Sequence, residues 1–246
     1  MFKRIISILA LSASLTTFAL AADQPQDSAQ AGRDVLAKNK EALVFVSAVA
    51  KMSMGTETHD EKMEATGLVI DASGLVICSL STIDPATDLG NSGQADSSIK
   101  SSLSDVKIMK ADNTEISAKL ILKDPDLDLA FIQADKATSA TFTAVSLEKT
   151  PEAKILDSII TLDRLGKDFG REPVVFLSRI SAIVTKPRTF FFSSDQGSSI
   201  SSPVFLLNGK LLGFRLLKAG PSEDSEPSPV IVPVGDILQA AQQVKK

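Results

Sequence analysis

The sequence has no tryptophan, no tyrosine, one histidine and one cysteine. Any aromatic platform on which single-stranded nucleic acids or sugars could stack would therefore have to be built from phenylalanine. The chain has 26 basic and 30 acidic residues, and this net charge of −4 argues against a nucleic-acid partner. The lone Cys78 cannot form an intrachain disulfide, and its apolar neighbours predict a buried, unreactive thiol.

The single histidine, His59, lies in the charge-rich stretch Gly55–Lys62, which predicts a loop with a solvated histidine. With Asp60 and Glu61 it could form a weak metal site. One histidine beside adjacent carboxylates lacks the spacing of a zinc motif, however. We therefore predict neither a metal site nor a cofactor.

The N-terminus has the pattern of a targeting signal. Lys3 and Arg4 precede an uncharged apolar run from Ile5 to Leu20, and Ala19-Leu20-Ala21 fits the small-x-small cleavage rule. We predict a signal peptide over residues 1–21, cleavage after Ala21, and export to the periplasm or the medium with no stable membrane anchor. An uncleaved anchor is the alternative. Cleavage would leave 24 basic and 30 acidic residues, a net charge of −6.

The rest of the chain predicts an all-β fold. Short runs rich in valine, isoleucine, leucine and phenylalanine alternate with turn residues, giving about a dozen strands, which is typical of a sandwich or a pair of barrels. Two polar segments, residues 82–104 and 219–228, predict loops. We divide the chain into a flexible leader, an N-terminal barrel that starts with a short helix over 34–39, and a C-terminal barrel with a terminal helix from Gly235. These units span residues 22–33, 34–145 and 146–246.

One stretch, from Ala65 to Ile83, reads A-T-G-L-V-I-D-A-S-G-L-V-I-C-S-L-S-T-I. It resembles the strand–turn–strand that carries the catalytic histidine in trypsin-fold proteases of the HtrA/Deg family, whose pattern is S-G-S-G-x-I-I-x-x-x-G-x-I-V-T-N-x-H-V-V. Ser81 stands in the histidine position. The resemblance implies a protease domain of two six-stranded antiparallel β-barrels with a short C-terminal helix. It covers the chain from about residue 35 to Lys246, and we expect no PDZ module to follow.

A second stretch, Lys123–Ile132, resembles the family's aspartate motif, D-P-x-x-D-[LI]-A-[LV]-[IL]. The resemblance makes Asp128 the equivalent of the triad aspartate, which orients the histidine in an active enzyme. Without a histidine, an aspartate that caps a turn before a strand is the better explanation of Asp128.

The serine motif of the family, G-N-S-G-G-P-[LV], is degraded here to G-S-S-I-S-S-P-V over residues 197–204. Anchoring the comparison at Pro203 puts Ile200 at the nucleophile position, whereas anchoring it at Gly197 puts Ser199 there. We prefer the Pro203 register because its spacing to the Asn208-Gly209 turn matches without gaps. In either register at least one glycine that shapes the oxyanion hole is lost.

These losses predict an exported, catalytically inactive homologue of a serine protease that binds a peptide or protein partner. By resemblance, the partner would add as a strand to an exposed edge. That edge would comprise Gly213, Phe214, Arg215, Leu216 and Leu217. One alternative is an active serine endopeptidase with an unorthodox site that uses Ser199 or Ser201. Another is a purely structural envelope protein without a retained cleft.

Overall fold

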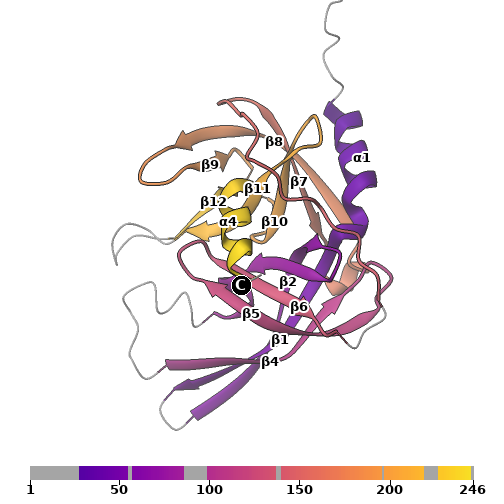
Figure 1. Cartoon of the computed structure of the whole chain (residues 1–246), viewed down its shortest axis with the longest axis vertical. Helices are drawn as coiled ribbons and strands as arrows, with labels where there is room; N and C mark the ends of the chain where they lie inside the picture. The colour runs from indigo at the N-terminus through magenta and orange to yellow at the C-terminus, as the bar shows by residue number, and fades with distance from the viewer. Residues whose placement is uncertain are drawn as a thin grey trace, which may run out of the picture.

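The computed structural model describes residues 28–54, 57–85, 99–136, 140–195, 197–218 and 227–244. The predicted signal peptide and parts of both predicted polar loops lie outside these residues. Within them, two closed antiparallel β-barrels of six strands each follow one another along the chain (Figure 1). The all-β, two-barrel prediction is therefore confirmed.

The first barrel has the strand order β1-β2-β3-β6-β5-β4 and closes by pairing of β4 with β1. Strand β5 alternates buried and exposed residues along much of its length, whereas β3 is buried throughout. A half-buried outer strand and a fully covered inner strand produce these two patterns. The strands are β1 Leu43–Met54, β2 Glu57–Asp71, β3 Leu75–Ser79, β4 Ile99–Met109, β5 Glu115–Asp124 and β6 Leu129–Ala134.

The second barrel has the strand order β10-β11-β12-β9-β8-β7 and closes by pairing of β10 with β7. Its strands β10 and most of β11 are buried. The predicted Asn208-Gly209 turn joins these two strands, with Gly209 at φ +78°. The strands are β7 Ser158–Arg164, β8 Pro173–Val184, β9 Phe190–Ser193, β10 Ser202–Leu206, β11 Leu211–Lys218 and β12 Ser228–Pro233.

The helices are short and lie outside the barrels. Helix α1 begins at Ser28, so the expectation of a flexible leader up to residue 33 is wrong for residues 28–33; Ala31 and Val35 bury one face of this helix. The terminal helix α4 covers Val234–Val244, close to the predicted start, and buries Ile237 and Ala241. The helical segments before α4 are α1 Ser28–Asn39, η1 Lys40–Ala42, α2 Leu80–Ile83 and η2 Lys167–Phe169.

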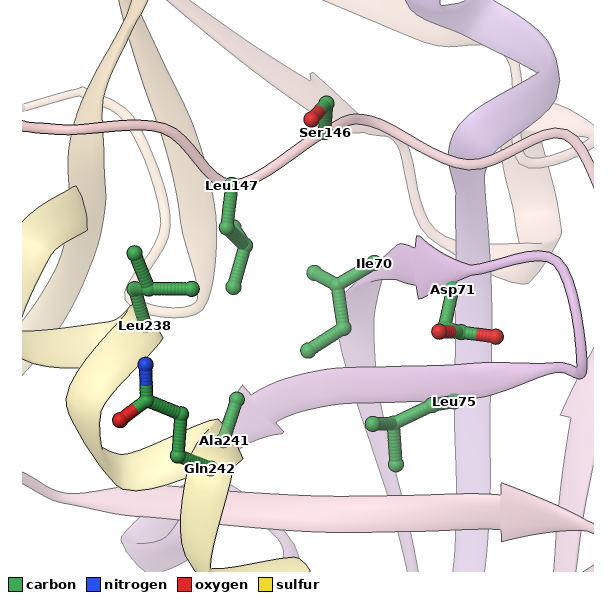
Figure 2. A pocket seen from close by; sticks show the side chains of 8 residues that line it. All are labelled: Ile70, Asp71, Leu75, Ser146, Leu147, Leu238, Ala241 and Gln242. Atoms are coloured by element: carbon green, nitrogen blue, oxygen red, sulfur yellow. The ribbon is translucent and has the colours of Figure 1, made fainter. Parts of the chain in front are cut away.

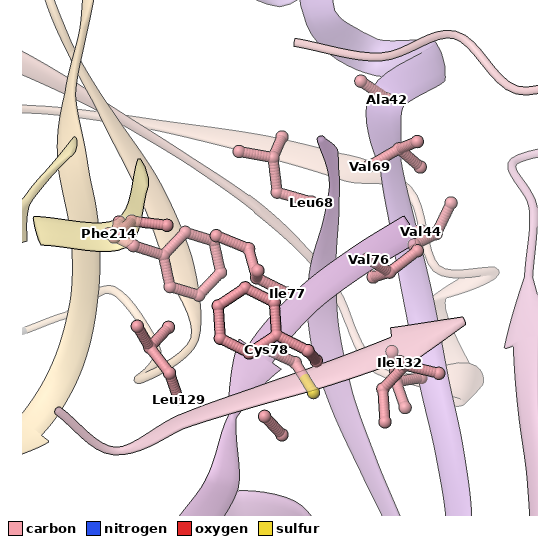
Figure 3. Close-up of a cluster of buried hydrophobic side chains, with 14 of the residues drawn as sticks. Ala42, Val44, Leu68, Val69, Val76, Ile77, Cys78, Leu129, Ile132 and Phe214 are labelled. Atoms are coloured by element: carbon pink, nitrogen blue, oxygen red, sulfur yellow. The ribbon is translucent and has the colours of Figure 1, made fainter. Parts of the chain in front are cut away.

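One hydrophobic core spans the two barrels, and a smaller buried cluster lies within the second barrel alone. A single cluster of buried side chains includes Ile77 and Phe131 from the first barrel and Phe205 and Phe214 from the second. Figure 3 shows Phe214 of the second barrel in the same buried cluster as Cys78 and Leu129 of the first. Burial of this kind contributes roughly 25 cal/mol per Å² of apolar surface, so separating the barrels would expose part of the core.

The outer halves of β1, β2 and β4 form a three-stranded arm beyond the first barrel. Pairing of β1 continues to the residue pair Met54–Glu57 with β2 and to Met54–Ile99 with β4. His59 lies in β2, paired with Met52, so the prediction of a loop around it is wrong; its side chain is exposed, as expected. Across the described ranges, helices are too short or too polar to cross a bilayer.

Candidate functional site

Asp128 accepts hydrogen bonds from both barrels. Its Oδ2 accepts from Ser79 Oγ at 2.8 Å and from the backbone N–H of Leu217 at 3.0 Å. Its Oδ1 accepts from the backbone N–H of Ser81 at 2.7 Å, and the hydroxyl oxygens of Ser79 and Ser81 lie 3.2 Å apart. The structure therefore brings Ser81 and Asp128 together. Serine hydroxyls and backbone amides, with no imidazole, satisfy the carboxylate.

Ser79 is the residue of this site that sequence reasoning missed. It ends β3 and caps the short helix α2, because its Oγ accepts from the backbone N–H of Thr82 at 3.2 Å. A serine between an apolar strand and a short helical turn is a typical N-cap signal, and that signal was available in the sequence. Ser79 thus links the end of β3 to the carboxylate of Asp128.

The environment of Asp128 differs from that of an ion-paired carboxylate. Burial raises the pKa of Asp128 above its usual range, although the hydrogen bonds from Leu217, Ser81 and Ser79 act in the opposite direction. The residue is 5% exposed. Over the described ranges, no ion pair involves this carboxylate. Asp128 is therefore a buried acid held by neutral donors.

Ser201 lies on the seam between the barrels and is fully buried. Its Oγ donates to the carbonyl of Thr66 at 2.6 Å and accepts from the backbone N–H of Ser79 at 2.7 Å. Its own N–H donates to the carbonyl of Arg215 at 2.8 Å. The hydroxyl proton is thus committed to a buried carbonyl, and Ser201 joins strands β2 and β3 to β11.

The backbone at Ser201 has a conformation that suits glycine. Ser201 has φ +78°, in the left-handed region that favours glycine. In the Pro203 register the family motif has a glycine at this position and a nucleophile at Ile200. In the Gly197 register, with Ser199 as the nucleophile, the family motif also has a glycine at position 201, so this backbone conformation does not distinguish the two registers.

Ser199 and Ile200 line a groove between the barrels of about 370 Å³, together with Thr66, Thr82 and Asp163. Ser199 is exposed and Ile200 half-buried. The backbone N–H of Ser199 donates to Asp163 Oδ2 at 3.2 Å, and Thr66 Oγ1 donates to Asp163 Oδ1 at 2.6 Å. The turn that would carry a nucleophile therefore lies beside the Ser79–Ser81–Asp128 cluster, and the Ser199 amide is bound to a carboxylate.

The amides just before Ser199 are also bound to a carboxylate. Asp195 Oδ1 accepts from the backbone N–H of Gly197 at 2.7 Å and of Ser198 at 3.3 Å. Burial alone would raise the pKa of Asp195, but hydrogen bonds from Ser198 and Gly197 and the charge of Arg215 lower it below the usual range. An oxyanion hole needs free N–H groups in this turn, and here the carboxylates of Asp195 and Asp163 already bind those of Gly197, Ser198 and Ser199.

The predicted peptide-binding edge is not an edge in this structure. Strand β11 pairs with β10 through Gly213, Phe214 and Arg215, and with β12 along Gly213–Lys218. The next inward-facing amide, that of Leu217, donates to Asp128. The prediction of an exposed edge over Gly213–Leu217 is therefore wrong, because closure of the second barrel and the Asp128 carboxylate occupy it.

Elsewhere in the described part of the chain, neither the pockets nor Cys78 provides a second set of catalytic groups. The pocket in Figure 2, of about 260 Å³, lies between the β2–β3 turn and α4 and is lined mainly by aliphatic side chains such as Ile70, Leu75 and Leu238. Cys78 is fully buried, and burial, reinforced by the charge of Asp128, raises the pKa of its thiol. Among the residues that the structure describes, no group of three or more histidine, cysteine, aspartate or glutamate side chains could hold a metal ion.

Comparison with solved structures identifies the fold. The crystal structure of Deg5 aligns with a TM-score of 0.57 over 87% of this chain and 93% of Deg5, at 14% sequence identity. The chain has the trypsin-like protease fold. No protein-family model and no curated protein matches its sequence. At 14% identity the likeness to Deg5 concerns the fold, so the activity of this trypsin-fold chain has to be argued from its own site.

Proposed function

We propose that this trypsin-fold chain is a catalytically inactive protease homologue that binds a peptide or protein partner. The observation that carries the proposal is the environment of Asp128, whose carboxylate is satisfied by Ser79, Ser81 and Leu217. In an active triad a histidine takes the proton of the nucleophile and passes it to the leaving group. A serine hydroxyl at position 81 does not take up a proton near neutral pH, so it supplies no general base.

The candidate nucleophiles support the same proposal. Ile200, at the nucleophile position of the preferred register, has no nucleophilic atom. Ser201 has its hydroxyl buried between Thr66 and Ser79. Ser199 is exposed, but its amide is bound to Asp163, and the only histidine of the sequence lies in the arm. An active endopeptidase that uses Ser199 or Ser201 is therefore the weaker alternative.

Binding of a partner does not require the catalytic histidine and serine that the motifs of this chain lack. The barrels and the grooves between their strands persist without a histidine, and proteins with sheet edges commonly recognise extended peptides through main-chain hydrogen bonds. The N-terminal pattern adds an exported location, periplasmic or secreted, to the proposal. The partner is thus expected among exported proteins.

A fluorophosphonate probe tests directly whether the chain lacks an activated serine. We expect no covalent labelling of the chain Ala22–Lys246 under conditions that fully label an active trypsin-fold protease, since the probe needs an activated serine. Ser199→Ala and Ser201→Ala serve as matched variants. Strong labelling of the unmodified chain that either variant abolishes would establish the active alternative instead.

A further inference from the structure

Strands β4 and β5 pair over three residue pairs only, Lys107–Ser117, Ile108–Ile116 and Met109–Glu115. Beyond them β4 continues back to Ile99 and stays paired with β1 on its other side. Strand β5 continues to Asp124 and stays paired with β6. The facing edges of β4 and β5 therefore diverge, and over the described residues neither edge has a strand partner on this side.

A groove of about 430 Å³ lies between the diverging strands. Its apolar lining comes from Leu103 and Val106 of β4 and from Ala118 and Leu120 of β5. Leu103, Val106 and Leu120 also pack against the main core, so the groove floor is continuous with the interior of the barrel. We name this hollow the β4–β5 groove. An apolar floor between two unpaired strand edges suits an extended chain that presents every second side chain to the floor.

The rim of the β4–β5 groove carries positive charge on the β5 side. Lys119 and Lys123 line it and alternate with the exposed Ile121 along the outer face of β5. Lys123 binds the buried Asp84 at 2.6 Å. Lys119 is 76% exposed in its side chain and lies 3.5 Å from Asp135, an exposed pair of little energetic weight. Lys119 therefore offers a charge that an acidic side chain in the groove could reach.

The two outer edges of the arm differ in the charge of their residues. The β2 edge carries Asp60, Glu61 and Lys62, and charged side chains of this kind discourage strand addition. The β4 edge reads Ser-Ser-Leu-Ser over residues 101–104, without charge or proline. Asp105, the one acid on the groove rim, is paired with Lys107 at 3.2 Å.

We propose that the β4–β5 groove binds an extended segment of a partner protein in which acidic and apolar residues alternate. The segment would add as a strand between β4 and β5, with apolar side chains on the floor and a carboxylate at Lys119. This inference rests on the partner binding in the proposed function and locates it in the first barrel, away from the Ser79–Ser81–Asp128 cluster.

The test uses the chain Ala22–Lys246 and a fluorescein-labelled heptapeptide in which glutamate alternates with valine. Fluorescence anisotropy should show saturable binding. A peptide with lysine in place of glutamate should bind about tenfold more weakly, because electrostatic complementarity selects the partner. Lys119→Glu should reduce or reverse the difference in affinity between the glutamate and the lysine peptide. Circular dichroism and thermal unfolding confirm that the variant is folded.

Two cysteine variants locate the site. Cys78 is buried, so Ser104→Cys and Ser117→Cys each introduce one accessible thiol on an exposed position. Ser104 lines the groove, whereas Ser117 lies on β5 where it is paired with β4. A bulky maleimide at position 104 should weaken peptide binding at least about tenfold by steric exclusion, and the same label at position 117 should change it less than about twofold.

Several results would overturn the inference: no binding of the glutamate–valine peptide, equal effects of both labels, or loss of binding only when Ser199→Cys is labelled in the inter-barrel groove. Its failure is distinct from failure of the proposed inactivity. Fluorophosphonate labelling reports on the serine site, and peptide binding reports on the β4–β5 groove.

Discussion

Ser201 shows how a hydroxyl in this position serves the fold. It lies between a buried N–H of Ser79 and a buried carbonyl of Thr66, and both of these groups belong to the first barrel while Ser201 belongs to the second. A buried backbone group that loses its partner is left without solvent and destabilises the protein. The residue therefore joins the barrels directly beside Ile200, the predicted nucleophile position.

Ser201→Ala should lower the free energy of unfolding by about 1–3 kcal/mol, because it leaves both backbone groups without a partner. Ser201→Gly removes the same hydroxyl but suits the positive φ, so it should destabilise the chain less than alanine does. Ser199→Ala, at an exposed position, should stay within about 0.5 kcal/mol of the parent. Urea unfolding measures all three. A Ser201→Ala protein as stable as Ser199→Ala would contradict this structural role.

Asp128 should make stability depend on pH. Its pKa is raised in the folded chain, so the native state binds more protons than the unfolded state between the unfolded pKa, about 4, and the folded value. The stabilising contribution is complete below that window and is lost as the pH rises through the folded pKa.

Asp128→Asn removes this titration. The variant should be less stable than the parent, since an amide cannot accept all three of its hydrogen bonds, but the difference should shrink as the pH rises from 4 to 8. Urea unfolding of both proteins across that range provides the measurement. A difference that widens with pH would indicate a lowered pKa and a charged, stabilising Asp128.

Among the strands, β11 differs most from its prediction: an exposed peptide-binding edge is expected from the sequence, whereas the structure shows a paired strand. Its glycine is required by packing, because a Cβ at Gly213 would lie 2.0 Å from the carbonyl oxygen of Val232 on β12. The close pairing of β11 with β12 buries this segment.

Gly213→Ala should therefore destabilise the chain by about 1–3 kcal/mol or more, since backbone must move to admit the methyl group. Gly166→Ala is the matched control: its φ is −63° and no atom lies within 4 Å of its would-be Cβ. That control should be neutral or slightly stabilising, because alanine restricts the unfolded chain. Thermal unfolding followed by circular dichroism compares the two, and equal melting temperatures would contradict the packing argument.

Local pattern explains which elements could be predicted. Apolar runs and turn residues indicated most strands, and the Asp128 and Ser81 positions followed from motif spacing. The sequence predicts a helix over residues 34–39, the second half of α1, but its start at Ser28 could not be placed from its weak apolar face, since the burial of Ala31 arises from tertiary packing. The charged residues around His59 suggested a loop, but pairing with β1 holds them in a strand. The pairing of β11 with both β10 and β12 could not be predicted, because no local pattern encodes long-range strand pairing.

At the scale of the molecule, the seam between the barrels has become a structural interface. Thr66 bonds both Ser201 and Asp163, and Arg171 binds Glu64 across the barrels at 3.0 Å. A shared apolar core continues the contact. Two barrels fixed in this way present a rigid body, which suits recognition through a surface groove better than closure around a substrate.

The predicted signal peptide determines where the mature protein is found. Lys3 and Arg4, the apolar run and Ala19-Leu20-Ala21 predict cleavage after Ala21. Mass spectrometry of protein purified from its native envelope should therefore show Ala22 as the first residue. Replacing Ala19 and Ala21 by arginine should block cleavage and retain the chain at the membrane, because the processing site accepts only small side chains at these positions. If the unmodified protein were found intact from Met1 in the membrane fraction, the segment would be an anchor, and partners would have to be sought at the membrane surface.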